Sequence, residues 1–265
     1  MQDWKEFYSR EEALLSTRFL KKGFIVKEVE SRDALEEISS YIEKKTADHL
    51  GLKDIPELDF LDNIHTKVSS NELNDLRLKL IADIHSCEWF RAAYFNLAKD
   101  MLSDIVGNEL VMQTRLNLSI QLPGDDSSLL PIHSDVWSGD SPYEVVIWLP
   151  LVDCFNTKSM YLLNPEKLSK HSADFLPEKH LDSEALYQLV KDDLIWLDVQ
   201  YGQVLLFNQN LPHGNRVNIE NQTRWSINCR FKSIFSPYED KKIGEFFEPI
   251  TLKPLTKFAL TNRWW

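Results

Sequence analysis

Residues 111–122 read VMQTRLNLSIQL, and their side chains alternate between two faces. One face is apolar apart from Thr114, and it carries Met112, Leu116, Leu118, Ile120 and Leu122. The other face is polar throughout, and it carries Gln113, Arg115, Asn117, Ser119 and Gln121. Successive side chains of a strand point to opposite faces, so this stretch predicts a β-strand with one face on a hydrophobic core.

More strands are expected on both sides of this stretch. A short one is predicted at 23–29, and others at 143–151, 159–163, 194–199, 204–207 and 224–235. Tyr201-Gly202-Gln203 is a turn signal between two of them. Helical spacing of apolar residues occupies 1–22, the segment after Ser31, and 71–106. Helices followed by many strands predict an antiparallel β barrel or sandwich that is buttressed by helices.

The chain is expected to form one domain over residues 1–265. Within it we predict a helical buttress at 1–106 and a β core at 107–235. The core carries a helical insertion at 165–193, with one helix around Ser183–Val190. The tail at 236–265 has no clear pattern, and its Trp264 and Trp265 are expected to pack on the domain surface.

Composition excludes several classes of partner. The chain has 41 acidic and 30 basic residues and a formal charge of −11, which disfavours nucleic acids and anionic membranes. Three widely spaced cysteines without a CxxC pair disfavour a disulfide framework and indicate a reducing compartment. The charged N-terminus does not resemble a signal peptide, and no apolar run reaches the ~20 residues of a membrane span. We therefore expect a cytoplasmic protein.

A candidate metal site comes from two segments that are far apart in the sequence. His133 and Asp135 are two residues apart in an extended segment, so their side chains point the same way. His213 follows the strand that begins after Gly202. Two imidazoles and one carboxylate on one face of a metal form the facial triad of non-haem Fe(II) oxygenases. An HxD tripeptide alone is weak evidence, and the alternative is an ordinary core or surface histidine.

A candidate co-substrate site lies eleven residues beyond His213. Arg224 and Ser226 share one face of the next predicted strand. A planar guanidinium binds a carboxylate through two parallel hydrogen bonds, and a hydroxyl two residues away could complete the contact. These residue types suit the distal carboxylate of 2-oxoglutarate. A solvated surface arginine is the alternative.

The polar face of 111–122 either lines the interior of the barrel or meets solvent. In the first case Gln113, Arg115 and Asn117 would contact substrate, and Gln121 could contact the co-substrate. Trp137 could stack on a sugar ring or simply pack. Arg230 could bind an anionic group of the substrate or pair with an internal acid.

Together these residues resemble the Fe(II)/2-oxoglutarate-dependent oxygenases of the phytanoyl-CoA-hydroxylase-like branch. The matching segments are Gly23–Val26, His133-x-Asp135, Gly202–Phe207, His213-Gly214-Asn215, and Arg224-x-Ser226 followed by Arg230-Phe231. The run from His133 to Asp153, with Thr157–Tyr161, is similar to oxygenases of bacterial surface-carbohydrate biosynthesis clusters. Leu163-Asn164-Pro165-Glu166 replaces the Pro-Gly-Ser-His stretch of that branch, which disfavours a lipid-CoA substrate.

The resemblance implies a mainly β fold: a double-stranded β-helix (jelly roll, cupin-like) core with N-terminal helices. It also implies Fe(II), 2-oxoglutarate and O2, with hydroxylation of a small molecule, a sugar or nucleotide sugar, in polysaccharide or secondary-metabolite biosynthesis. Two alternatives remain. One is a metal-dependent isomerase or epimerase without oxygen chemistry, and the other is a carbohydrate-binding jelly roll without catalysis.

Overall fold

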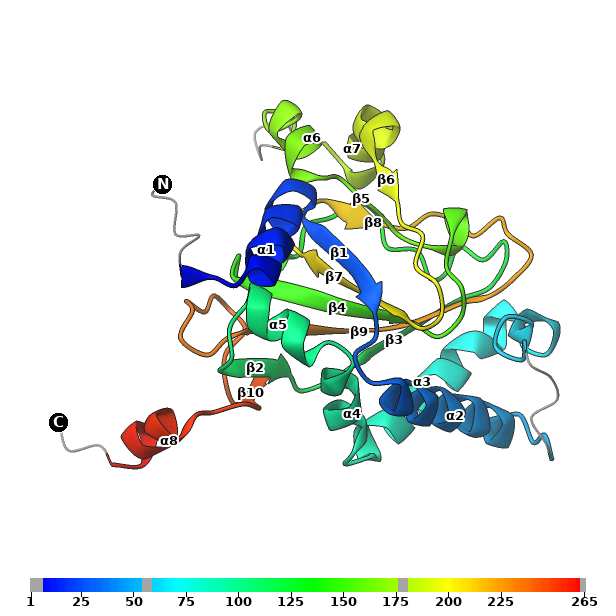
Figure 1. Ribbon diagram of the computed structural model, residues 1–265. Coiled ribbons are helices and arrows are strands. Elements are labelled where there is room, and N and C mark those ends of the chain that lie inside the picture. The colour runs from blue at the N-terminus through cyan, green and yellow to red at the C-terminus, as the bar shows by residue number, and fades with distance from the viewer. Residues whose placement is uncertain (1–6, 54–58, 176–180, 263–265) are drawn as a thin grey trace.

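The computed structural model of the protein describes residues 7–53, 59–175 and 181–262, as a layered arrangement of helices and two antiparallel sheets (Figure 1). Its α-helices are α1 (Arg10–Lys22), α2 (Arg32–His49), α3 (Ser70–Ser86), α4 (Phe90–Asn96), α5 (Lys99–Ile105), α6 (Pro165–Lys170), α7 (Ser183–Val190) and α8 (Pro254–Thr261). Local sequence sets their ends. For example, α1 begins at a capping box of Ser9 and Glu12 and ends at Gly23, which adopts a left-handed conformation.

The larger sheet has seven strands, all paired in antiparallel fashion. Their order is β1 (Phe24–Glu28), β7 (Gln203–Asn208), β4 (Glu144–Pro150), β9 (Arg224–Ser233), β2 (Leu110–Gln113) and β10 (Phe247–Pro249), and β3 (Asn117–Gln121) also pairs with β9. The smaller sheet has the order β6 (Ile195–Trp196), β5 (Tyr161–Leu162) and β8 (His213–Gly214). In Figure 1 the smaller sheet lies above the larger one, beneath α6 and α7.

The expected strands are all present, but the alternating stretch at 111–122 is not one continuous strand. It bends at Thr114–Leu116 and forms β2 and β3, both of which pair with β9. Met112 lies opposite Phe231 and Asn117 lies opposite Asn228, so this chain has two more residues than its partner between the two pairs. An even number of extra residues preserves the alternation, and its apolar side chains remain buried.

One hydrophobic core joins the helices to the larger sheet. It extends from α2, α3 and α4 to the buried faces of β4, β7 and β9. The hydroxyl of the buried Tyr94 in α4 donates to the carbonyl oxygens of Ile147 at 2.8 Å and Ile227 at 3.0 Å. The N-terminal helices thus hold the strands that carry the candidate site residues.

The insertion and the C-terminal tail contain more helices and strands than the sequence indicated. The insertion at 165–193 has α6 in addition to the expected α7. The tail contributes β10 to the edge of the larger sheet, and α8 then projects from the body of the protein (Figure 1). Trp264 and Trp265 lie outside the described residues. No helix within the described ranges is long and apolar enough to cross a membrane.

Candidate metal centre and cavity

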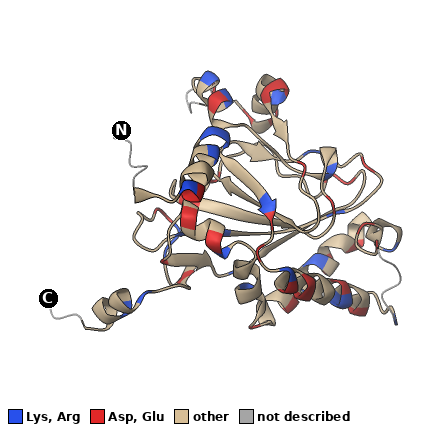
Figure 2. Cartoon of the chain, in the orientation of Figure 1, with Lys and Arg blue, Asp and Glu red and all other residues tan. Residues whose placement is uncertain are grey.

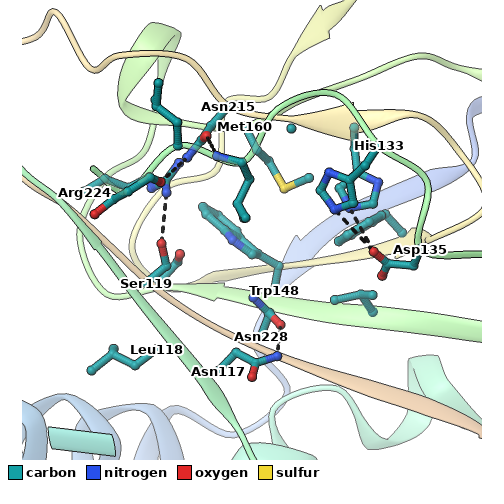
Figure 3. Close-up of a pocket in the computed structure, with 18 of the residues that line it drawn as sticks. Asn117, Leu118, Ser119, His133, Asp135, Trp148, Met160, Asn215, Arg224 and Asn228 are labelled. Carbon is teal, nitrogen blue, oxygen red and sulfur yellow. Dashed lines mark hydrogen bonds and ion pairs between the residues drawn. The ribbon is translucent and has the colours of Figure 1, made fainter. Parts of the chain in front are cut away.

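His133, Asp135 and His213 converge on one point, where each offers one ligand atom within 4.8 Å of the others. Figure 3 shows His133 and Asp135 at this point. Backbone pairing brings the two histidines together. The His133 amide donates to the His213 carbonyl at 2.9 Å, and the His213 amide donates to the His133 carbonyl at 2.8 Å. The Asp135 amide continues this pairing by donating to the Gln209 carbonyl at 3.1 Å. The predicted ligand set is therefore adjacent in space.

Both imidazole rings are oriented in the same way. Nδ1 of His133 lies 2.8 Å from the carbonyl oxygen of Pro131, and Nδ1 of His213 lies 2.8 Å from that of Leu211. A carbonyl accepts only, so each Nδ1 carries a proton, and Nε2 is the atom of each ring that is left to bind a metal. These Nε2 atoms lie 3.4 Å and 3.8 Å from Asp135 Oδ1. Both rings are thus oriented with Nε2 toward the carboxylate of Asp135.

Asp135 uses its two oxygens differently. Oδ2 accepts from Arg230 through Nη2 at 2.8 Å and Nε at 3.2 Å, whereas Oδ1 faces the histidines. Arg230 is also held by the Gln209 side chain at 3.0 Å and lies 3.4 Å from the buried Asp140. This arrangement leaves one oxygen of Asp135 for a metal ion.

The charge states at the centre also suit a cation. Burial lowers the pKa of His213 to about 4, so its ring is neutral near pH 7. Burial alone would raise the pKa of Asp135, but the hydrogen bond with His133 and the charge of Arg230 hold it well below its usual value. For His133, burial opposes the hydrogen bond with Asp135, and the pKa is raised overall. A neutral imidazole beside an ionised carboxylate is a ready donor set for a divalent metal.

Gly214 allows the chain segments to approach closely next to His213. A Cβ added at this position would lie 2.6 Å from the Leu130 carbonyl oxygen and 2.8 Å from the Tyr161 hydroxyl. Any larger residue would therefore push β8 away from β5 and from the segment that leads to His133. The residue after the metal ligand is glycine because the backbones meet here.

A cavity of about 450 Å³ opens at the metal centre, and its lining residues come from both sheets. Its apolar wall is formed by Val146 and Trp148 of β4, Met160, and Phe207 of β7. Figure 3 shows Trp148 and Met160, in this view, between Arg224 and the metal ligands. A cavity of this size, with apolar walls and a few convergent polar groups, is typical of a small-molecule site.

Arg224 lines this cavity, and no carboxylate of the described residues pairs with it. Its side chain is buried, and burial lowers the pKa of its guanidinium to about 10, so it remains charged at neutral pH. It donates to the Ser159 carbonyl at 3.2 Å and to the Ser119 hydroxyl at 3.0 Å. Its Nε and the Ser226 hydroxyl are buried without a hydrogen-bond partner among the residues that the structure describes. A buried cation beside unsatisfied donors fits an anionic ligand in the cavity.

The other predicted site residues are divided between the cavity and its surroundings. Asn117 and Arg230 line it. Gln113 lies behind Arg230, with its Oε1 accepting from the Arg230 backbone amide at 3.3 Å. Gln121 is buried opposite Arg224 in the strand register, and its amide donates to the Arg216 carbonyl. Arg115 is exposed, and Trp137 packs against Phe175; both lie outside the cavity lining.

Several lining residues were not anticipated from the sequence. They are Arg77 on α3, Trp148 on β4, Met160, Asn215, and Asn228 on β9. Asn228 shares the face of Arg224, Ser226 and Arg230, so the alternation of β9 would have identified it. Arg77 lies in a helix far before His133 in the sequence, and its sequence neighbours do not distinguish it from a surface arginine.

No family model and no curated protein sequence matches the chain, whereas solved structures resemble its fold. A non-heme monooxygenase, ThoJ, in complex with nickel has a TM-score of 0.53 and 16% identity, over 83% of this chain and 77% of that one. HygX from Streptomyces hygroscopicus, with nickel and 2-oxoglutarate bound, has a TM-score of 0.50 and 16% identity, over 90% of this chain and 91% of that one. EctD from S. alaskensis, with 2-oxoglutarate and 5-hydroxyectoine, has a TM-score of 0.51 and 17% identity, over 88% of this chain and 78% of that one. At these identities the likeness establishes a shared fold.

Proposed function

We propose that the protein is a non-haem Fe(II) oxygenase that uses 2-oxoglutarate as co-substrate. One observation carries the proposal: Arg224, a buried arginine without an acidic partner in the described part of the chain, shares a cavity with a complete His–Asp–His donor set. Either feature alone is compatible with many kinds of protein. Together they match the two ends of 2-oxoglutarate, which binds a metal through its 2-oxo acid and needs a cation for its distal carboxylate.

The donor set fits Fe(II). Two imidazole Nε2 atoms and one carboxylate oxygen would occupy one face of the ion and leave the remaining positions for exchangeable ligands. Iron bound there supplies the activation of O2 that couples decarboxylation of 2-oxoglutarate to oxidation of a substrate C–H bond. The fold likeness to HygX, which was solved with nickel and 2-oxoglutarate, supports the same ligands here.

The protein's own residues have distinct roles in this proposal. Arg224 and Ser226 hold the distal carboxylate, and their unsatisfied Nε and hydroxyl groups become paired when it binds. Arg230 holds Asp135 so that Oδ1 faces the metal. Val146, Trp148 and Phe207 exclude water from the space between the two ends. Such a dry, preorganised cavity keeps a reactive centre from side reactions.

We also propose a fold family and a substrate class. The two antiparallel sheets with the site between their strands suit a double-stranded β-helix, and the motif resemblance favours the phytanoyl-CoA-hydroxylase-like branch. The amide and hydroxyl groups of Asn117, Ser119, Asn215 and Asn228 line the cavity and suit a hydroxyl-rich substrate such as a sugar derivative. We propose hydroxylation of such a molecule as the reaction.

An anaerobic titration tests this function. Fe(II) followed by 2-oxoglutarate should produce the weak visible charge-transfer band of the chelate. His213→Ala should remove metal binding. Arg224→Gln should weaken 2-oxoglutarate binding by about 1.5–3 kcal/mol, which is about tenfold to 100-fold.

Arg115→Gln is the matched control, because Arg115 is exposed and lies outside the cavity. Its band and its 2-oxoglutarate affinity should equal those of the wild type. A full-strength band in both His213→Ala and Arg224→Gln would defeat the proposal. Metal binding without any effect of 2-oxoglutarate would instead indicate a non-oxidative metal enzyme.

A further inference from the structure

The charges around the cavity are unusual for so acidic a chain. The protein carries a formal charge of −11, and Figure 2 shows acidic and basic residues interspersed over its helices and loops. The cavity, however, is lined by three arginines, Arg77, Arg224 and Arg230, and by a single carboxylate, Asp135. A lining of this kind attracts an anionic ligand into an otherwise acidic protein.

Two of the three arginines are already accounted for. Arg230 pairs with Asp135 and lies beside Asp140. Arg224 is assigned to the distal carboxylate of 2-oxoglutarate, so the present inference rests on the proposed function for that pairing. Arg77 has neither of these roles. Its guanidinium donates to the Asn74 side-chain oxygen at 2.6 Å and forms no ion pair within residues 7–53, 59–175 and 181–262.

The position of Arg77 is fixed by the way α3 packs. The buried stripe of this helix includes Leu73 and Leu80, four residues before and three after Arg77, so the arginine stands at its border. α3 packs against β3, and His85 near its C-terminus contacts the Leu116 carbonyl at 3.3 Å. Arg77 is thus held at the wall of the cavity that β3 also forms.

Two amides on neighbouring strands line the same cavity. The Asn117 side-chain amide of β3 donates to the side-chain oxygen of Asn228 on β9 at 3.0 Å (Figure 3). This bond orients Asn228 so that its own NH₂ group remains available as a donor. A guanidinium and an oriented amide in one cavity can bind the oxygens of a phosphate or a carboxylate.

We propose that the substrate of this site is an anionic small molecule, whose phosphate or carboxylate group binds Arg77 together with the Asn117–Asn228 pair. The rest of the molecule then extends along the cavity toward the metal centre. Arg77 is a specificity-determining residue that selects charged over neutral substrates. This separates it from Arg224, which binds the co-substrate.

Calorimetric titration of three small probes tests the proposal. Glycerol 1-phosphate, glycerate and glycerol share a carbon chain and differ in their charged group. The protein is loaded with nickel and 2-oxoglutarate, so that Arg224 is occupied and no turnover takes place. At least one of the two charged probes should bind more tightly than glycerol, and the stronger one identifies the phosphate or the carboxylate.

Three variants assign the effect to one residue. Arg77→Gln should weaken binding of the preferred anion about tenfold, because a charge-assisted contact is lost, and glutamine preserves the helix. Arg77→Lys should retain most of the affinity. Arg18→Gln, an exposed change on α1 outside the cavity, should match the wild type. Equal binding of the charged probes and glycerol, or unchanged affinity in Arg77→Gln, would overturn the proposal.

A second background tests the anion site independently of 2-oxoglutarate binding. In an Arg224→Gln background the other candidate anion site is absent, and the probes can be titrated without 2-oxoglutarate. An effect of Arg77→Gln in this background supports the anion site even if 2-oxoglutarate does not bind the protein. Loss of that effect, with normal 2-oxoglutarate binding in the parent protein, defeats the anion site alone.

Discussion

In the proposed function, Arg224 stabilises the 2-oxoglutarate complex at the expense of the ligand-free fold. It is buried without a carboxylate partner among the described residues, and a buried unpaired charge is costly. Arg224→Met should therefore raise the free energy of unfolding of the ligand-free protein by about 1 kcal/mol. The same change should abolish stabilisation by 2-oxoglutarate. Thermal unfolding with and without 2-oxoglutarate measures both effects.

Arg216→Met is the control for this experiment. Arg216 forms a partly exposed ion pair with Glu184, so its replacement should change the unfolding free energy by less than about 0.5 kcal/mol. A clear loss of stability in Arg224→Met would show that Arg224 is a structural residue and not a ligand-binding one.

Arg230 is expected to tune metal affinity without touching the metal. It donates two hydrogen bonds to Asp135 Oδ2 and so fixes the direction of Oδ1. Arg230→Gln should weaken Co(II) binding about tenfold to 100-fold, the usual effect of losing a partner that orients a metal ligand. Titration followed by the visible absorption of Co(II) measures this. Metal binding as tight as in the wild type and in Arg115→Gln would show that Arg230 does not position Asp135.

The sequence was sufficient to propose the candidate ligand set but not the groups around it. His133, Asp135 and His213 were predicted from residue type and spacing, because metal coordination restricts both. The contacts of Arg230 with Gln209 and Asp140 depend on three segments that meet only in the folded protein. Arg77 was missed for a similar reason, since an arginine on a helix gives no local sign of the cavity beside it.

At the scale of single elements, β8 lies against the segment that leads to His133 with no room for a side chain at Gly214. Gly214→Ala would place a Cβ 2.6 Å from the Leu130 carbonyl oxygen, which is backbone and cannot rotate away. We expect a loss of about 1–3 kcal/mol in unfolding free energy and weaker metal binding, because the His133–His213 pairing must widen. Urea unfolding and Ni(II) titration test this.

Gly244→Ala offers a comparison, because a Cβ added there meets no atom within 4 Å. Gly244 has a positive φ of 89°, so the substitution introduces backbone strain alone. It should lower stability while leaving metal affinity unchanged. Equal loss of metal affinity in the two variants would contradict a specific role for the close approach at Gly214.

Most strands were predictable from an alternating or apolar run, whereas β8 and β10 were not. β9 alternates over ten residues, and β4 is a seven-residue run of mostly apolar side chains. β10 has three residues, which is too few to show any alternation, and it is a strand because β2 offers a free edge. The bend at Thr114–Leu116 was invisible because its two extra residues leave the alternation intact.

At the scale of the whole molecule, the candidate metal centre lies where the smaller sheet meets the larger one. His213 belongs to the smaller sheet, His133 to the long segment before β4, and Asp135 contacts Arg230 on the larger sheet. A metal ion that binds these ligands in the folded state alone should stabilise the fold by about 2.7 kcal/mol at 100 times its dissociation constant. For a chain of this size, each kcal/mol corresponds to about 2–4 °C in melting temperature.

Melting curves with and without Ni(II) should show this increase, and His213→Ala should lose it. Amide exchange adds a local measurement. The His133 and His213 amides bond to each other's carbonyl oxygens, so metal binding should slow their exchange more than that of the Tyr94-braced strands β4 and β9. Uniform slowing across both sheets would mean that the ion stabilises the fold only globally. Protection confined to the histidine segments would place the metal at the junction between the two sheets.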